Sequence, residues 1–112
     1  MKNYKIQILE DAKEDIKEII AYIKNKLKEP EIAKQHKKAF KDAIKELKDT
    51  ASIYNVIDEE TIEIKNIRKI NVKNFMIFHR IIDNENIVQI IAVYYAKSNW
   101  RDKLKLRKSN LY

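Results

Sequence analysis

Apolar positions in the first half of the chain follow a strand period and then a helix period. Residues 4–9 alternate apolar and polar side chains, which predicts a half-buried β-strand. Residues 11–28 carry apolar side chains three and four positions apart, which predicts an amphipathic helix, and Asp11 followed by Glu14 predicts its N-cap. A second amphipathic helix should begin at Pro30, because proline lacks the N–H that a first helical turn leaves unpaired. The short link between them predicts an antiparallel helical hairpin.

From about residue 51 the period changes to that of strands. Three runs are rich in isoleucine, valine and aromatic residues, as half-buried strands are. They are TIEIKNIRKINV (61–72), FMIFHRII (75–82) and NIVQIIAVYYA (86–96). Short polar segments separate the last three strands, so an antiparallel meander is expected.

The chain contains no glycine. A turn that needs a positive φ must therefore use a residue that tolerates the left-handed region, usually asparagine or aspartate. We expect Asn74 and Asn84 to take this role, because they lie in the two segments that join the strands.

The predicted fold is α+β, with an N-terminal strand, a helical hairpin and a three-stranded antiparallel meander in one domain spanning residues 1–112. The first strand should join the same sheet, and the hairpin should pack on one face to bury the isoleucines of both layers. The opposite face would remain for binding. The basic tail, about 101–112, is expected to form a short helix over Trp100, Leu104 and Leu106, or to be partly free.

Positive charge is concentrated in the second half of the chain. The net charge is +7, but residues 1–64 carry 13 lysines against 14 acids. Residues 65–80 contribute +5 and residues 97–112 another +5. A protein with an acidic or nucleic-acid partner has this distribution, although a solvated lysine-rich surface has it too.

The composition argues against several classes of protein. There is no cysteine and there are only two histidines, so we expect no metal site and no cofactor. The N-terminus lacks the apolar run of a signal peptide or membrane span, which favours a cytoplasmic protein that is not embedded in a membrane.

Three segments resemble toxins of the RelE/ParE superfamily of type II toxin–antitoxin systems. They are YKIQILEDAKEDIKEIIAYI, IRKINVKNFMIFHRI and VQIIAVYYAKSNW, in the order and spacing of that family. The resemblance implies a growth-inhibiting toxin neutralised by a cognate antitoxin. One branch of the superfamily cleaves mRNA on the ribosome and the other poisons DNA gyrase, so the fold alone does not decide the mechanism.

The match to the nuclease branch is incomplete. Lys69 stands at the first basic position of the second strand, but Met76 stands where the nucleases carry an arginine on the third. Four further departures lie near the end of the chain, where relatives often have an arginine, a glycine, an arginine and an aspartate: Ala92, Ala96, Ser98 and Asn99. A relative that only binds an antitoxin therefore stays open as an alternative.

The remaining candidates could still provide RNA cleavage, which requires a base, an acid and cations around the phosphate. The candidate catalytic residues are Lys69, His79, Tyr94 and Tyr95. The candidate nucleic-acid-binding residues are Arg68, Lys69, Lys73, Arg80, Lys97 and Arg101. Strand alternation places His79 among apolar neighbours, where a core role is the more common one, and points Tyr94 and Tyr95 to opposite faces.

The clustering of charge favours ribosome-bound mRNA slightly over gyrase as the target. Under every alternative a cognate antitoxin is expected. Its acidic segment, studded with apolar residues, should cover the basic sheet face and the tail.

Overall fold

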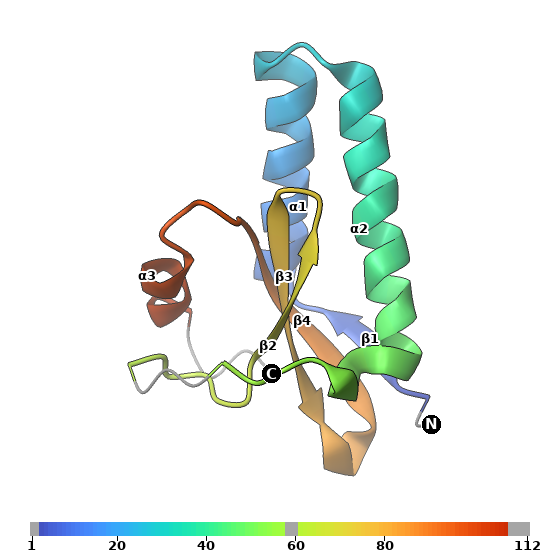
Figure 1. Cartoon of the computed structure of the whole chain (residues 1–112), viewed down its shortest axis with the longest axis vertical. Helices are drawn as coiled ribbons and strands as arrows, with labels where there is room; N and C mark the ends of the chain where they lie inside the picture. The colour runs from blue at the N-terminus through green and yellow to red at the C-terminus, as the bar shows by residue number, and fades with distance from the viewer. Residues whose placement is uncertain (1–2, 58–60, 108–112) are drawn as a thin grey trace.

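The computed structural model describes residues 3–57 and 61–107, so the last part of the predicted basic tail, 108–112, lies outside the described residues. Two long helices stand beside a twisted sheet, and a short third helix lies on its other side (Figure 1). The elements in chain order are β1 (Lys5–Ile8), α1 (Glu10–Ala21), a π-helical turn (Tyr22–Lys26), α2 (Pro30–Thr50), a 3-10 turn (Ala51–Ile53), β2 (Arg68–Val72), β3 (Phe75–Ile82), a second 3-10 turn (Asp83–Glu85), β4 (Ile87–Tyr95) and α3 (Trp100–Lys105).

The four strands form one sheet in the order β1-β4-β3-β2. The β2, β3 and β4 strands pair antiparallel, as a meander does, and β1 joins β4 in parallel. The predicted meander and the predicted place of the first strand in the same sheet are both confirmed.

The helical hairpin covers one face of the sheet, as predicted. Its apolar stripe meets the strand residues that point the same way, and together they form the larger apolar core. The buried members of this core include Ala12, Phe40, Ile44, Leu47, Ile70, Ile77, Val88, Ile90 and Val93. Pro30 occupies the first turn of α2, as expected from its missing N–H.

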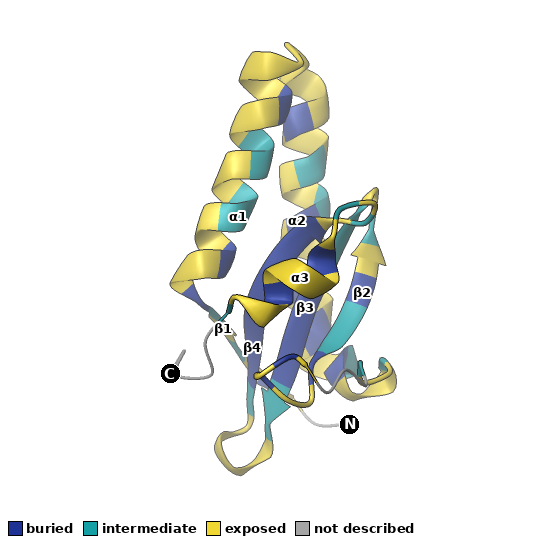
Figure 2. Ribbon diagram, turned by 90° about the vertical axis from the view of Figure 1, so that its left-hand side faces the viewer, coloured by how far each residue is buried: buried dark blue, intermediate teal, exposed yellow. Residues whose placement is uncertain are grey.

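The opposite face is covered as well, which corrects the expectation that it would stay bare. A second apolar cluster forms where α3 and the segment before β2 pack on the sheet (Figure 2). It includes Ile62, Ile64, Ile67, Phe78, Ile91, Trp100 and Leu104. The central strands β3 and β4 are apolar on both sides, and such strands need a layer on each face. Leu106 was predicted to lie on the apolar side of α3 together with Trp100 and Leu104, but it is exposed.

Residues 61–67 are not part of a strand, because β2 begins only at Arg68. Ile62, Ile64 and Ile67 are buried at near-alternating positions in the second cluster. Their spacing matches that of a strand, but it reflects burial of an irregular segment rather than a hydrogen-bonded ladder.

Three local predictions are wrong: the N-cap at Asp11 and the positive φ angles at Asn74 and Asn84. Helix α1 begins at Glu10, with Leu9 at the N-cap and no side-chain cap, so Asp11 is already inside the first turn. The positive φ angles of the two strand-joining turns belong to Lys73 (57°) and Asn86 (58°), not to Asn74 and Asn84. Val72 pairs with Phe75, so the first turn has two residues, and a two-residue turn with positive φ at its first position resembles type II′.

Candidate functional site: a cationic pocket beside Trp100

A pocket of about 440 Å³ opens on the face of the sheet that carries α3. It lies between the loop that follows α2, the outward side chains of β2 and the start of α3. Its lining residues are Ile53, Tyr54, Asn55, Val56, Ile57, Lys69, Asn71, Trp100 and Arg101. The bridge between Val56 and Arg68, and a 2.7 Å hydrogen bond from the Ile57 N–H to the Ile67 carbonyl, hold the loop beside the edge strand β2.

The indole ring of Trp100 gathers two cations at this pocket. The guanidinium carbon of Arg101 lies 4.2 Å from the ring centroid, and the Nζ of Lys69 lies 5.5 Å from it. Both distances fall within the range of cation–π attraction. The ring itself is buried against Phe78, with centroids 5.3 Å apart. A buried aromatic side chain therefore brings together cations from β2 and α3.

Helix α3 is held in place by a pair of charged side chains that cap the edge of β4. Beyond Ile90 this strand no longer pairs with β1. The Val93 N–H donates to Asp15 (3.0 Å), and Arg107 donates both to the Ile91 carbonyl (3.0 Å) and to the two Asp15 oxygens (2.8 Å each). Burial raises the pKa of Asp15, against the lowering effects of the Val93 N–H and of Arg107. Asp15 and Arg107 thus replace a neighbouring strand and fix the end of α3 to α1.

Lys69 and Arg101 are the predicted binding residues that line the pocket. Arg68, the neighbour of Lys69 in sequence, points to the other side of β2, as strand alternation requires. Its guanidinium donates to the carbonyl oxygens of Ser52 (3.2 Å) and Tyr54. Arg68 therefore supports the loop that lines the pocket and does not face into it.

The other predicted cations lie elsewhere. Arg80 is buried, and its Nε donates to Gln89 (2.9 Å), whose amide donates to Gln7 (2.8 Å). Lys73 and Lys97 are exposed in the turns that follow β2 and β4. The structure does not gather the predicted cations into one concavity.

His79 is buried, with no side-chain or backbone exposure. Its Nε2 lies 3.2 Å from the Ala51 carbonyl, and burial, aided by the charge of Arg68, lowers its pKa to about 4. At neutral pH the imidazole is therefore uncharged and shielded from solvent.

The two tyrosines point to opposite faces, as predicted, and neither lines the pocket. Tyr94 is buried in the second cluster, where burial raises the pKa of its phenol. Tyr95 is exposed and packs against Phe75 on the helical side, with ring centroids 5.7 Å apart.

The sequence pattern did not single out Tyr54, and it marked Trp100 without giving it a role in the site. Tyr54 lies in an irregular loop with no period to mark it. Trp100 carried a signal, because a lone tryptophan beside an arginine can hold a cation near its ring.

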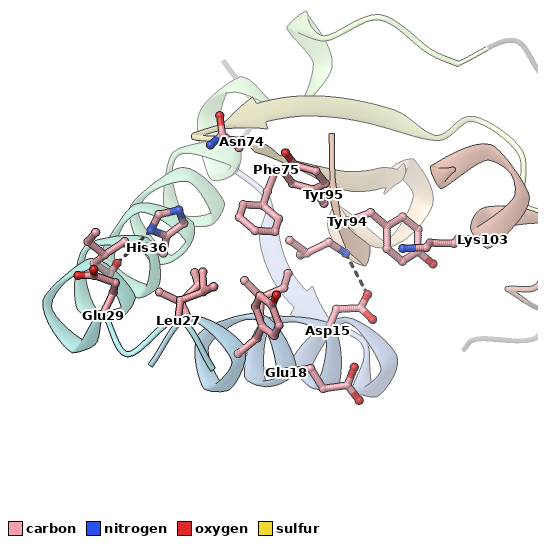
Figure 3. A pocket seen from close by; sticks show the side chains of 15 residues that line it. Asp15, Glu18, Leu27, Glu29, His36, Asn74, Phe75, Tyr94, Tyr95 and Lys103 are labelled. Atoms are coloured by element: carbon pink, nitrogen blue, oxygen red, sulfur yellow. Dashed lines mark hydrogen bonds between the residues drawn. The ribbon is translucent and has the colours of Figure 1, made fainter. Parts of the chain in front are cut away.

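A second concavity is larger and mostly apolar. It has a volume of about 950 Å³ and lies between the helical hairpin and the ends of β3 and β4 (Figure 3). Tyr22 and Leu27 line it with more than half of their surface exposed, at 56% and 52%. Glu18 and Glu29 give its helical wall negative charge. We call this concavity the hairpin groove.

The family-model match spans residues 6–100 and is described as ParE toxin of the type II toxin–antitoxin system parDE. The chain therefore belongs to the ParE toxin family, and it is the toxin component of a type II toxin–antitoxin system. The predicted resemblance to RelE/ParE toxins is confirmed. No curated protein sequence matches the chain.

Solved structures support the same fold. A chromosomal ParDE toxin–antitoxin system from P. aeruginosa matches with a TM-score of 0.67 and 16% identity, covering 85% of this chain and 98% of the other. The toxin–antitoxin complex RelBE2 from Mycobacterium tuberculosis has a TM-score of 0.58 and 15% identity, with 83% and 98% coverage. A mutant of the E. coli toxin RelE in the free state has a TM-score of 0.57 and 14% identity, with 93% and 95% coverage.

Within residues 3–57 and 61–107, no three side chains of the metal-binding types lie close enough together to hold an ion. No helix in these two ranges is long and apolar enough to cross a membrane.

Proposed function

We propose that this toxin acts by binding its target and not by cleaving RNA, and that the target is DNA gyrase. The observation that carries the proposal is the chemistry of the cationic pocket. Its described lining contains Lys69 and Arg101 but no histidine and no carboxylate. Such a pocket binds anionic groups, yet it offers no general base of the usual kind.

Cleavage of RNA without a metal needs a group that takes the 2′-hydroxyl proton, and a pKa near the working pH suits that task. His79 has a pKa of about 4 and no exposed surface, so a substrate hydroxyl cannot reach it. Tyr94 is buried as well. On the described lining the remaining candidates are Lys69 and the Tyr54 phenol, and neither is the histidine or carboxylate that most often acts as a general base. The gyrase-directed branch of the superfamily needs no such group.

Ribosome-dependent mRNA cleavage is the second candidate function. The pair of cations over Trp100 favours it, because cations and an aromatic ring also bind a nucleotide. In that case Lys69 and Tyr54 would be the groups on the described lining that exchange protons, and Lys69→Ala/Tyr54→Phe would abolish cleavage.

We also propose a cognate antitoxin whose apolar side chains enter the hairpin groove and whose acidic side chains cover the cationic pocket. The exposed apolar residues of the groove support the first part, and the charges of Lys69 and Arg101 support the second.

Leu27→Ser is expected to weaken antitoxin binding at least tenfold, measured by titration calorimetry. Leu106→Ser removes a leucine that is even more exposed than Leu27 but lies outside the groove, and it should leave binding unchanged. Equal effects of the two substitutions would refute the groove assignment.

The target is tested by inducing the toxin alone and following plasmid supercoiling and mRNA integrity in the same cells. We expect plasmids to lose negative supercoils while full-length mRNA persists. Cleaved mRNA together with an unchanged topoisomer distribution would overturn the gyrase proposal and favour the second candidate.

A further inference from the structure

The exposed surface of α2 is divided lengthwise by charge. At 3.6 residues per turn, six of its lysines fall within about 100° of the helix circumference. They are Lys34, Lys37, Lys38, Lys41, Lys45 and Lys48, and all six are exposed. We call this row the lysine ridge. With a rise of 1.5 Å per residue it is about 21 Å long.

Four of these lysines form no close ion pair with a neighbouring acid in the described part of the chain. The carboxylates of α2 lie along one flank of the ridge, where Lys34 pairs with Glu31 (3.7 Å) and Lys38 with Asp42 (2.7 Å). Lys37, Lys41, Lys45 and Lys48 make no ion pair with any carboxylate in the described part of the chain. Four cations therefore stay available for an external anion.

The net charge along the chain hides this ridge. Residues 1–64 are nearly neutral in total, because they contain 13 lysines and 14 acids, and the two kinds of residue are interspersed along the sequence. The helical period separates the two kinds of charge in space, placing the lysines on one strip and the acids beside them.

The composition of the ridge favours phosphates over a protein surface. A protein interface has an apolar or aromatic centre and is depleted in lysine. Between Lys34 and Lys48 no apolar side chain of α2 falls within the arc of the ridge, since the apolar positions of this stretch are on the side that packs on the sheet. The lysine ammonium group binds a phosphate as a point charge. A row of lysines can therefore contact a phosphate backbone without the close shape complementarity of a protein interface. At 3.4 Å per base pair, 21 Å corresponds to about six base pairs of DNA.

We propose that the lysine ridge docks on the phosphate backbone of a DNA duplex, at a surface distinct from the cationic pocket. The choice of DNA over RNA rests on the proposed function, because the proposed target, DNA gyrase, acts on duplex DNA. The ridge leads toward the pocket, since Lys48 precedes by five residues the loop that begins the pocket lining at Ile53.

The affinity test uses a 20-base-pair DNA duplex and fluorescence anisotropy. The ridge variant is Lys37→Gln/Lys41→Gln/Lys45→Gln. The matched control, Lys17→Gln/Lys24→Gln/Lys26→Gln, removes three exposed lysines from the first helix and its π-helical turn, so both proteins lose the same charge. We expect the ridge variant to bind at least tenfold more weakly, with a slope of log K against log salt reduced by about 2 to 3, since each phosphate contact contributes about 0.9. Equal affinities of the two variants would overturn the proposal.

The identity of the nucleic acid is tested with the protein's lack of cysteine. Lys41→Cys provides a unique thiol for a photoreactive label, and Lys17→Cys is the control position. In a mixture of gyrase, DNA and ribosomes, we expect position 41 to attach to DNA and position 17 to do so at least fivefold less. Attachment of position 41 only to RNA or only to protein would overturn the assignment to DNA. These outcomes are separate from the supercoiling readout, so the ridge and the gyrase proposal can fail independently.

Discussion

His79 and Arg80 are adjacent on β3, and each is buried on its own side of the sheet. His79 faces the helical hairpin and meets the Ala51 carbonyl, whereas Arg80 faces the other layer and donates to Gln89. Polar side chains in such places must be satisfied by the protein, because burial removes their water. Their chemistry therefore serves the fold rather than a substrate.

The buried imidazole predicts a pH dependence of stability. Its pKa is about 4 in the folded chain, against an ordinary value of 6.5. Between these values the unfolded chain binds more protons, so stability is fully present above pH 6.5 and falls as the pH drops toward 4. The loss should be on the order of 3 kcal/mol.

The measurement is urea unfolding of the native protein and of His79→Gln at pH 7, 6, 5 and 4. The variant keeps an amide that can donate to the Ala51 carbonyl and should lose this component. The raised pKa of Asp15 acts in the opposite direction, since stability then falls as the pH rises through its titration, but it is common to both proteins and cancels in the difference. Parallel curves for the two proteins would contradict the assignment.

The ion pair of Asp15 and Arg107 should be worth more than those on the surface. Both side chains are mostly buried, with 16% and 13% exposure. Arg107→Met leaves the Asp15 carboxylate buried without its partner, so we expect a loss of about 3 kcal/mol in the free energy of unfolding. The double variant with Asp15→Asn should recover part of that loss.

The exposed pair of Lys38 and Asp42 is the control for this double-mutant cycle. Its coupling should be too small to measure, because solvent screens it. A coupling between Asp15 and Arg107 no larger than that of the control would show that they do not anchor α3.

At the scale of elements, α3 depends on a few contacts with the second apolar cluster. Leu104 is fully buried, whereas Leu106 is 79% exposed. Leu104→Ala should cost about 2 to 4 kcal/mol and release α3 from the sheet. Leu106→Ala should change stability by less than about 0.5 kcal/mol.

Hydrogen exchange of the α3 amides and chemical denaturation would both report on these variants. Faster exchange confined to α3 in Leu104→Ala is the expected pattern. The same small effect from both substitutions would mean that α3 is not docked through Leu104.

Elements with an unbroken period were predictable from sequence. The run FMIFHRII forms β3 at residues 75–82, and Pro30 marks the start of α2, because local chemistry alone fixes such features. The segment 61–67 was not predictable, since buried isoleucines at near-alternating positions occur both in strands and in irregular chain packed on a core. The turn at Lys73 was not predictable either, because strand pairing imposes a positive φ on a residue that does not favour it.

The site was only partly predictable for a related reason. Strand alternation in β2 is a local property, and it is enough to place Arg68 and Lys69 on opposite faces. The pocket itself depends on contacts between distant segments, such as the bridge of Val56 with Arg68 and the pairing of Asp15 with Arg107. No local pattern encodes those contacts.

At the scale of the whole molecule, positive charge occupies two surfaces and the apolar groove occupies a third. The cations over Trp100 form a small pocket, the lysines of α2 form a long ridge, and the hairpin groove has an acidic rim. Added salt should therefore weaken binding of the target to the cationic surfaces. It should affect binding of the antitoxin to the hairpin groove less, because apolar burial does not depend on ionic strength.

The most direct test of the account is inhibition of purified gyrase by variants of the pocket. Lys69→Ala/Arg101→Ala removes the cations that lie over Trp100, and Lys73→Ala/Lys97→Ala removes the same charge from exposed turns outside the pocket. We predict that the pocket variant needs at least ten times more protein than the native toxin to inhibit supercoiling, whereas the control stays within twofold. Equal potency of the pocket variant and the native toxin would contradict the claim that this pocket meets the target.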